Sequence, residues 1–259
     1  MKRLLTILTA LSLIATACQK DPIANASITP QPAYVGEDIT FTNLSAYTDY
    51  TEWDMGDGYT SKAYNVIHSY YDPGTYTVNQ RSFRDKGGMS SASYRVEVIG
   101  SELKIIVQEY YEIGATPGAY IPNAEIYLFH TLDDWDTGDI NLAIGPFYTN
   151  NYGEVTISDL SYQRYYVDAY YQSGNTGWNN WILGGEDAIW IETQLLTGWE
   201  YHTFYAFVDP VIYGDKKSAP AVESERKGRI PYAPAAGLKN AGQDRPFREN
   251  KSTQAREKK

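Results

Sequence analysis

Beyond its first two dozen residues, this sequence contains no long stretch with apolar residues at helical spacing. Short segments instead alternate apolar and polar residues, and turn signals rich in Gly, Pro, Asn and Asp separate them. Residues 34–43 alternate through Val35, Ile39 and Phe41, and residues 94–98 alternate strictly. Because alternation puts every second side chain on one face of a strand, the pattern predicts an all-β chain of short, half-buried strands.

The clearest turn signals lie in two motifs, W-D-M-G-D-G at residues 53–58 and H-S-Y-Y-D-P-G-T-Y-T-V at residues 68–78. In both, glycines permit positive φ, and aspartates can accept hydrogen bonds from nearby backbone amides. Strands separated by such turns predict an antiparallel sandwich. We expect Asp54, Asp57 and Asp72 to satisfy turn amides rather than to bind a metal, and His68 to be a structural hydrogen-bonding residue.

Together the two motifs resemble the PKD domain, over residues 24–99. Trp53 stands where an immunoglobulin-like sandwich keeps its core tryptophan, and Tyr76 stands where a tyrosine corner keeps its tyrosine. The resemblance implies a sandwich that serves as a spacer or binding module and not as a catalytic domain. The positions that match the family pattern are Trp53, Asp54, Gly56, Asp57, Gly58, His68, Tyr70, Pro73, Gly74, Tyr76 and Val78.

A second set of strand and turn patterns follows in residues 101–213, with strands expected near residues 103–107, 123–129, 154–157 and 165–170. Their order resembles the transthyretin-like or carboxypeptidase-regulatory-like sandwich family, whose members are accessory modules. The sequence therefore predicts two tandem immunoglobulin-like antiparallel β-sandwiches.

Residues 133–139 form the densest acidic cluster of the chain. A D-x-D-x-G run can wrap Ca²⁺ with oxygen ligands, but a calcium hand also needs a Glu six residues after its Gly, and Ile144 stands there. We favour a solvated acidic loop and predict no cofactor. A looser Ca²⁺ site formed by Asp134, Asp136 and Asp139 stays open as the alternative.

Residues 174–181 form the most unusual predicted loop, in which two tryptophans flank two amides: Trp178, Asn179, Asn180 and Trp181. Three interpretations stay open. Trp181 and Trp190 fill the sandwich core; the tryptophans anchor a protein interface, where Trp concentrates binding energy; or they stack on sugar rings while the amides bind hydroxyls.

The N-terminus predicts export and lipidation. Residues 1–17 have the basic start, short apolar run and small residues of a secretory signal peptide. Cys18, the only cysteine, stands in a setting that resembles a bacterial lipobox, so acylation would leave it as the mature N-terminus. Residues 18–23 would be the anchor linker, and residues 19–21 resemble the surface-export signal of Bacteroidota lipoproteins. We expect an outer-membrane lipoprotein that faces the cell exterior.

Charge is distributed unevenly along the chain. Residues 18–214 carry 8 Lys and Arg against 26 Asp and Glu, a net charge of −18, which argues against nucleic acid as a partner because phosphates would be repelled. Residues 214–259 carry 12 against 6, a net charge of +6, and have few large apolar residues. We expect this segment to be a disordered basic tail.

No nucleophile–base pair, phosphate-binding loop or metal-ligand motif stands out in the sequence, so we expect a non-catalytic protein. The leading hypothesis is a lipid-anchored cell-surface protein that docks onto another envelope protein, as an accessory subunit of an outer-membrane complex. The alternative is a glycan-binding surface lipoprotein that captures polysaccharide through Trp178 and Trp181.

Overall fold

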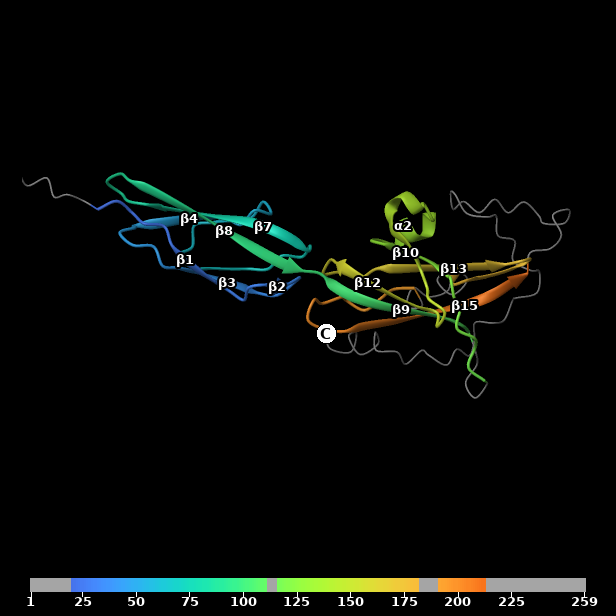
Figure 1. Ribbon diagram of the computed structural model, residues 1–259. Coiled ribbons are helices and arrows are strands. Elements are labelled where there is room, and N and C mark those ends of the chain that lie inside the picture. The colour runs from blue at the N-terminus through green and yellow to red at the C-terminus, as the bar shows by residue number, and fades with distance from the viewer. Residues whose placement is uncertain (1–19, 111–115, 182–190, 213–259) are drawn as a thin grey trace, which may run out of the picture. The chain divides into compact units, whose positions relative to one another are not determined.

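The computed structural model describes residues 20–110, 116–181 and 191–212. The expected signal peptide, Cys18, Trp190 and the basic tail lie outside these residues. The chain divides into two compact units (Figure 1): most of residues 20–97 form the first, and residues from Val98 onward form the second together with the short segments 34–37 and 70–74. Each is built almost wholly of strands, so the predicted all-β fold is confirmed.

The first module consists of two sheets. A three-stranded sheet has the order β1 (Ala26–Thr29), β3 (Ile39–Asn43), β6 (Val66–His68). The order of the five-stranded sheet is β2 (Ala33–Tyr34), β8 (Met89–Ile99), β7 (Gly74–Phe83), β4 (Tyr50–Asp54), β5 (Thr60–Ser61).

The core of the first module joins side chains from both sheets. Phe41 of β3 meets Trp53 of β4 edge to face, with ring centroids 6.1 Å apart. Trp53 is 2% exposed and donates its indole N–H to the carbonyl of Ala63 at 3.1 Å, so its one polar atom is satisfied. The alternating residues Val35, Ile39 and Phe41 are all fully buried, which confirms the core face predicted from their spacing.

The second module has seven strands in the order β11-β10-β13-β14-β15-β9-β12. Their bounds are β9 Ser101–Glu109, β10 Glu125–Phe129, β11 Ala143–Tyr148, β12 Glu154–Leu160, β13 Tyr166–Ser173, β14 Thr176–Asn179 and β15 His202–Ile212.

Strand β15 connects the two halves of this order. Residues 202–208 pair with β9, and residues 209–212 pair with β14. The β9–β15 pairing is parallel, so the expectation of antiparallel pairing throughout is wrong at this one ladder. The remaining described ladders of the module are antiparallel, and its core is filled by alternate residues of β9, β10, β13 and β15.

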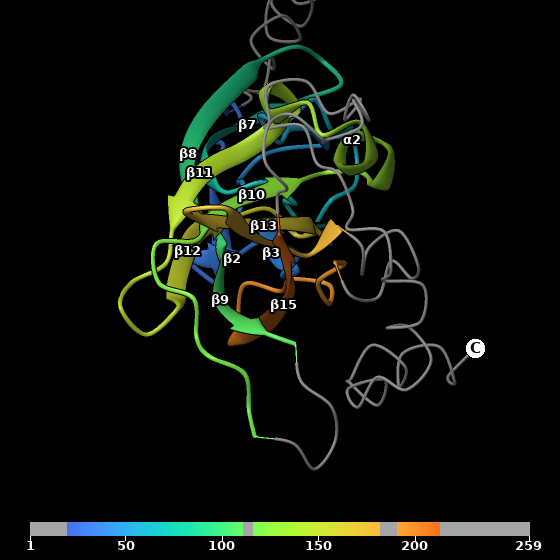
Figure 2. The same cartoon turned by 90° about the vertical axis from the view of Figure 1, so that its right-hand side faces the viewer.

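Strand β10 is buried on both faces, which alternation alone did not predict. Ile126 and Leu128 face the main core, whereas Tyr127 and Phe129 face a second cluster built around Trp135. Trp135 lies on a short helix, α2 (Leu132–Thr137), which lies beside β10 and β13 (Figures 1 and 2). Its indole N–H donates to the carbonyl of Val167 on β13 at 3.0 Å, and this bond fastens the helix to the sheet.

Candidate functional site

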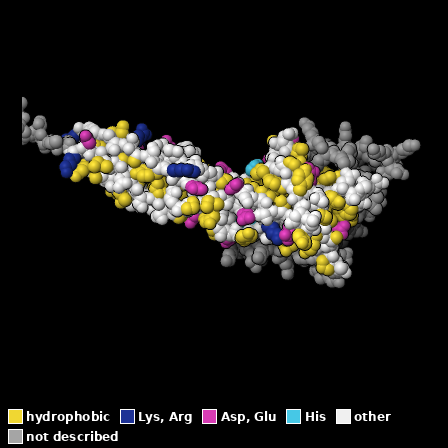
Figure 3. All heavy atoms as spheres, viewed as in Figure 1, with side chains coloured by type: hydrophobic (Ala, Val, Ile, Leu, Met, Phe, Trp, Pro, Cys, Tyr) yellow, Lys and Arg dark blue, Asp and Glu magenta, His cyan; other side chains and the backbone are white. Residues whose placement is uncertain are grey.

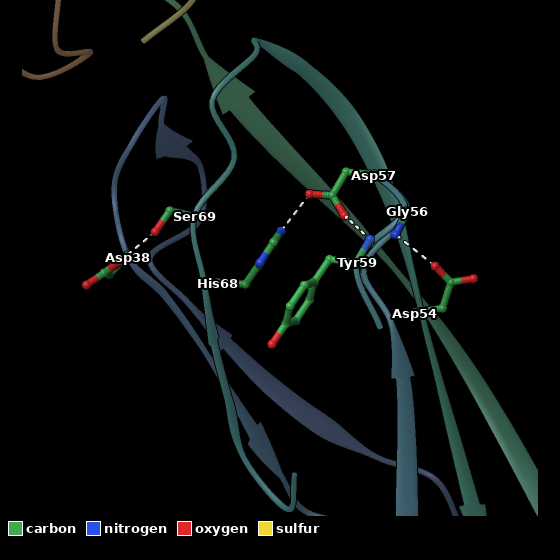
Figure 4. A network of polar contacts seen from close by, with 7 residues as sticks. All are labelled: Asp38, Asp54, Gly56, Asp57, Tyr59, His68 and Ser69. Carbon is green, nitrogen blue, oxygen red and sulfur yellow. Dashed lines mark hydrogen bonds and ion pairs between the residues drawn. The ribbon is translucent and has the colours of Figure 1, made fainter. Parts of the chain in front are cut away.

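The turn after β4 holds a network of polar contacts at one end of the first module (Figure 4). Asp54 accepts a hydrogen bond from the backbone N–H of Gly56 at 3.1 Å, and Asp57 accepts one from Tyr59 at 3.0 Å. Both aspartates therefore satisfy turn amides, as the sequence predicted. Gly56 has a φ of +82°, and a Cβ there would lie 2.6 Å from the carbonyl oxygen of Thr77, so only glycine fits.

His68 joins this turn to the neighbouring sheet. Its Nε2 lies 2.7 Å from Oδ2 of Asp57, and the ring of Tyr59 stacks on the imidazole with centroids 4.8 Å apart (Figure 4). Beside this pair, Ser69 donates its hydroxyl to Asp38 at 2.6 Å. The predicted hydrogen-bonding role of His68 is thus confirmed, and its partner is a carboxylate of the first motif.

The ionisation of Asp57 follows from these contacts. Burial acts to raise the pKa of the carboxyl, but the Tyr59 amide and the His68 imidazole outweigh it, and the pKa lies below its ordinary value of 3.8. The carboxylate is therefore charged at neutral pH, where it holds the imidazole against the turn. This arrangement fixes the turn after β4 to strand β6.

The remaining positions of the PKD-like pattern lie on β7 and just before it, and residues 70–74 among them group with the second unit. Tyr70 and Val78 are buried, and Tyr76 is half-buried on β7. Gly74 has a φ of +152° and begins β7 directly after Pro73.

A buried polar network, which the sequence analysis did not find, crosses the first module's interior. Gln80 Nε2 donates to Asn43 Oδ1 at 2.9 Å and to Ser45 Oγ at 3.0 Å, and Asn43 Nδ2 donates to Thr51 Oγ1 at 2.9 Å. Burial raises the pKa of the Tyr94 hydroxyl, which stays protonated and donates to Gln80 Oε1 at 3.2 Å. The signal was present in the sequence as polar residues at inward positions of β3 and β7.

The acidic segment of the second module is not a loop, and this prediction is wrong. Thr131 accepts the N–H of Asp134 at 3.1 Å as a helix N-cap, and Gly138 ends the helix with a φ of 62°. Asp134 accepts the hydroxyl of Thr131, and Asp139 caps the following 3₁₀ turn through Asn141. Asp136 is exposed on α2. In the part of the chain that the structure describes, no group of three or more His, Cys, Asp or Glu side chains is placed to hold a metal ion.

The predicted loop of tryptophans and amides is also wrong in its secondary structure. Trp178 and Asn179 lie on β14 between β13 and β15, and Asn179 and Asn180 are fully buried. Asn180 is committed to the backbone: its Oδ1 accepts from the Ala169 amide at 3.0 Å, and its Nδ2 donates to the Val167 carbonyl at 2.8 Å. These amides cannot reach a sugar hydroxyl, so this glycan platform is overturned.

The two tryptophans are half-buried and hydrogen-bonded within the module. Trp178 packs against the main core and donates its indole N–H to Glu109 at 2.6 Å. Trp181 packs against the cluster around Trp135 and donates to Asp168 at 2.6 Å. Of the three interpretations, the structure supports the core for both side chains.

Exposed aromatic side chains lie elsewhere on this module, beside and along β15. Tyr201 is 80% exposed, and Tyr205 is 44% exposed and stacks on Phe207 with ring centroids 6.2 Å apart. Because residues 201, 203, 205 and 207 alternate along the strand, these three rings share its outer face. Ile106 of β9 is paired with Tyr205 and presents its side chain to the same face. Phe207 itself is buried, at 3% exposed, so Tyr201 and Tyr205 supply the exposed rings. We call Tyr201, Tyr205 and Phe207 the aromatic row.

The start of the described chain is fastened to the first module. The ammonium of Lys20 donates to the Tyr47 hydroxyl at 3.0 Å and lies 4.8 Å from the ring centroid. Arg84 donates to the carbonyl of Lys20 at 2.6 Å. The linker expected at residues 18–23 is therefore held against the module from Lys20 onward. The described residues include no helix with both the length and the apolar character needed to span a bilayer.

Comparison with known proteins agrees with the architecture of the first module, since residues 19–98 match the PKD domain family. The PKD1 domain of Vibrio anguillarum Epp is 25% identical, and the alignment covers 31% of this chain and 95% of that one with a TM-score of 0.28. The PKD1 domain of the Vibrio cholerae metalloprotease PrtV is 24% identical, with 30% and 98% covered and a TM-score of 0.27.

A third similar structure spans more of the chain. BcpA, the major pilin subunit of Bacillus cereus, is 11% identical, and the alignment covers 73% of this chain and 71% of that one with a TM-score of 0.27. The match of residues 19–98 to the PKD domain family confirms, for the first module, the resemblance predicted from the two motifs. The transthyretin-like resemblance of residues 101–213 stays a prediction.

Proposed function

We propose that this chain is a non-catalytic lipoprotein, anchored in the outer membrane through Cys18 and facing the cell exterior. Its second module docks onto another envelope protein, and the chain acts as an accessory subunit of an outer-membrane complex. The observation that carries this proposal is the aromatic row, because Tyr201 and Tyr205 are 80% and 44% exposed beside and on β15, a strand that β9 pairs over residues 202–208.

The chemistry of the row suits a protein partner. Tyr and Phe supply large contact area at a low cost in conformational entropy, and binding energy at interfaces concentrates in such residues. The paired β9 positions add Lys104 and Ile106 to the same face, and Lys104 is neutralised by Glu154 at 2.8 Å. Ile106 is buried, at 7% exposed, so the surface offered here is the two exposed tyrosine rings beside a paired charge, which suits an interface with a polar rim.

Affinity purification from detergent-solubilised membranes tests the proposal. The chain at native levels should recover one partner in a fixed ratio, and Tyr201→Ser with Tyr205→Ser should abolish that recovery. The matched control is Tyr148→Ser with Tyr152→Ser, since these tyrosines are 58% and 74% exposed on the same module but lie off β15. Recovery of the chain alone, or equal recovery with both double variants, would overturn docking through this row.

The anchor is tested separately. Metabolic labelling with a palmitate analogue should mark the wild-type chain and leave Cys18→Ser unmarked. Labelling that persists in Cys18→Ser would place the lipid elsewhere and end this part of the proposal. Protease added to intact cells should degrade the wild-type chain if it faces outward, and complete protection would contradict that orientation.

A further inference from the structure

The end of the first module at which the chain enters carries a group of large apolar side chains in water. Exposed fractions are 56% for Ile23, 53% for Leu44, 45% for Tyr47, 47% for Tyr50 and 57% for Met89. These residues come from three segments: the entering chain, the β3–β4 loop and the β7–β8 hairpin. We call residues 20–23, 44–50 and 83–89 the entry tip.

Contacts between the three segments hold the entry tip in one arrangement. Ile23 and Ala46 exchange two backbone hydrogen bonds, of 2.9 and 3.0 Å. Pro22 packs on the hairpin, since a Cβ built at Gly88 would lie 3.1 Å from its ring. With Lys20 tied to Tyr47 and Arg84, the apolar side chains keep a fixed direction and form a surface rather than three independent loops.

The entry tip is electrically neutral, in contrast to the rest of the mature body. Its three basic residues, Lys20, Arg84 and Lys86, are balanced by the three acidic residues Asp21, Asp49 and Asp85. Residues 18–214 as a whole carry a net charge of −18. Figure 3 shows hydrophobic side chains beside Lys and Arg at this end. An anionic phospholipid surface can therefore approach the tip without the repulsion that meets it over most of the body.

The short linker from Cys18 to Lys20 limits the distance between the entry tip and the acyl chains of the proposed anchor. Cys18 stands two residues before Lys20, and two residues span at most about 7 Å even when fully extended. Acyl chains on Cys18 would therefore hold the fastened Lys20 at the depth of the headgroups, because no slack remains in the linker. Tyrosine rings and the long stems of Lys and Arg are the side chains favoured at that depth.

We propose that the entry tip lies against the phospholipid headgroups, with Leu44, Tyr47 and Met89 at the membrane interface. This inference rests on the proposed Cys18 anchor. Strand β4 runs from Tyr50 at the tip to Asp54 at the turn network, so the network of Figure 4 lies at the opposite end of the module and remains in water. The bilayer then restrains the orientation of the first module as well as its position.

The sole cysteine allows a test that does not depend on acylation in cells. The chain from Cys18 onward is coupled to a maleimide phospholipid in vesicles of phosphatidylethanolamine and phosphatidylglycerol, and amide exchange is compared with that of Cys18→Ser mixed with the same vesicles. Exchange in residues 44–49 and 84–88 should slow about threefold or more on coupling, whereas exchange in residues 56–59 should not change.

Two matched variants separate the surface from the tether. Leu44→Ser with Met89→Ser should remove most of the protection of the tip. Ile67→Ser should retain it, because this side chain is 65% exposed and its residue pairs with Thr40 of β3, away from the tip. Unchanged exchange at the tip on coupling, or equal protection in both variants, overturns the inference. Failure of palmitate labelling in cells would instead overturn the anchor and leave this measurement standing.

Discussion

The indole N–H of Trp181 donates a 2.6 Å hydrogen bond to the carboxylate of Asp168, which is fully buried on β13. The ring of Tyr170 stacks on Trp181, with ring centroids 6.1 Å apart. A carboxyl group at such a position needs hydrogen-bond partners, because burying a polar group without them is costly. Trp181 thus serves the interior of the second module, which is one of the three interpretations that its sequence setting left open.

Replacing this donor should destabilise the second module. Trp181→Phe keeps an aromatic ring but removes the N–H, and leaving a buried acceptor without its donor costs about 1–3 kcal/mol. Urea unfolding followed by circular dichroism measures the loss. Trp199→Phe is the control, since Trp199 is 51% exposed, and we expect its free energy of unfolding to change by less than about 0.5 kcal/mol. Equal losses in both variants would contradict the assigned role of Trp181.

The turn glycines of the first motif should differ sharply in their tolerance of alanine. Gly56→Ala would force a Cβ to within 2.6 Å of the Thr77 carbonyl oxygen in addition to the strain of a φ of +82°. At Gly58 the φ is +98° and no atom lies within 4 Å, so only the backbone strain of about 1–2 kcal/mol applies. Thermal unfolding should therefore show the larger loss for Gly56→Ala, and a larger loss for Gly58→Ala would refute this steric account.

The Asp57–His68 contact should make the first module's stability depend on acid. Since the folded-state pKa of Asp57 lies below 3.8, its contribution is present above that pH and is lost as the pH falls through the folded-state value. Asp57→Asn should cost about 1–3 kcal/mol at neutral pH, and this difference from wild type should shrink below pH 3.8. Unfolding of both proteins between pH 7 and 2 measures it.

Asp85→Asn provides the control for this pH series, because Asp85 is exposed in the β7–β8 hairpin of the same module. Its unfolding curve should follow that of wild type across the whole range. A constant difference between Asp57→Asn and wild type from pH 7 to 2 would show that the lost contact does not depend on the charge of Asp57.

The N-cap of α2 should carry a measurable part of the helix's stability. Thr131→Ala removes the hydroxyl that accepts the Asp134 amide, at an expected cost of about 1 kcal/mol. Thr131→Ser keeps an accepting hydroxyl and should restore most of that loss. Chemical denaturation of wild type, Thr131→Ala and Thr131→Ser measures these differences. A Thr131→Ser variant as unstable as Thr131→Ala would argue against capping.

Local chemistry made the first module predictable. The turn of residues 53–58 is determined by glycines that need positive φ and by aspartates that bond two residues ahead, and both properties are written in neighbouring positions. The core face of Val35, Ile39 and Phe41 follows from alternation in the same way. The link from Asp57 to His68 was not predictable, because it joins positions 11 apart through the sheet arrangement.

The second module was harder to predict because burial on two faces erases alternation. Strand β10 buries every residue from Ile126 to Phe129. Gly174, which has a φ of 58°, lies in the turn before β14, and the strand begins two residues later at Thr176. Helix α2 has only six residues, and Trp135 is the single side chain that it buries, so the segment shows no helical repeat of buried apolar residues. Its capping residues Thr131 and Gly138 were visible in the sequence, but the density of aspartates between them favoured the interpretation as a loop.

The parallel pairing of β15 with β9 determines when the second module can close. Leu103 pairs with His202, which comes 99 residues later in the chain. The other strands of the sheet also depend on β15, because it lies between β14 and β9 and joins them. Since long-range pairing must wait for both partners, the module's folding rate is limited by the arrival of its last strand. A chain that ends before His202 would leave β9 with an open edge and an uncovered core, which is the condition under which strands pair with other molecules.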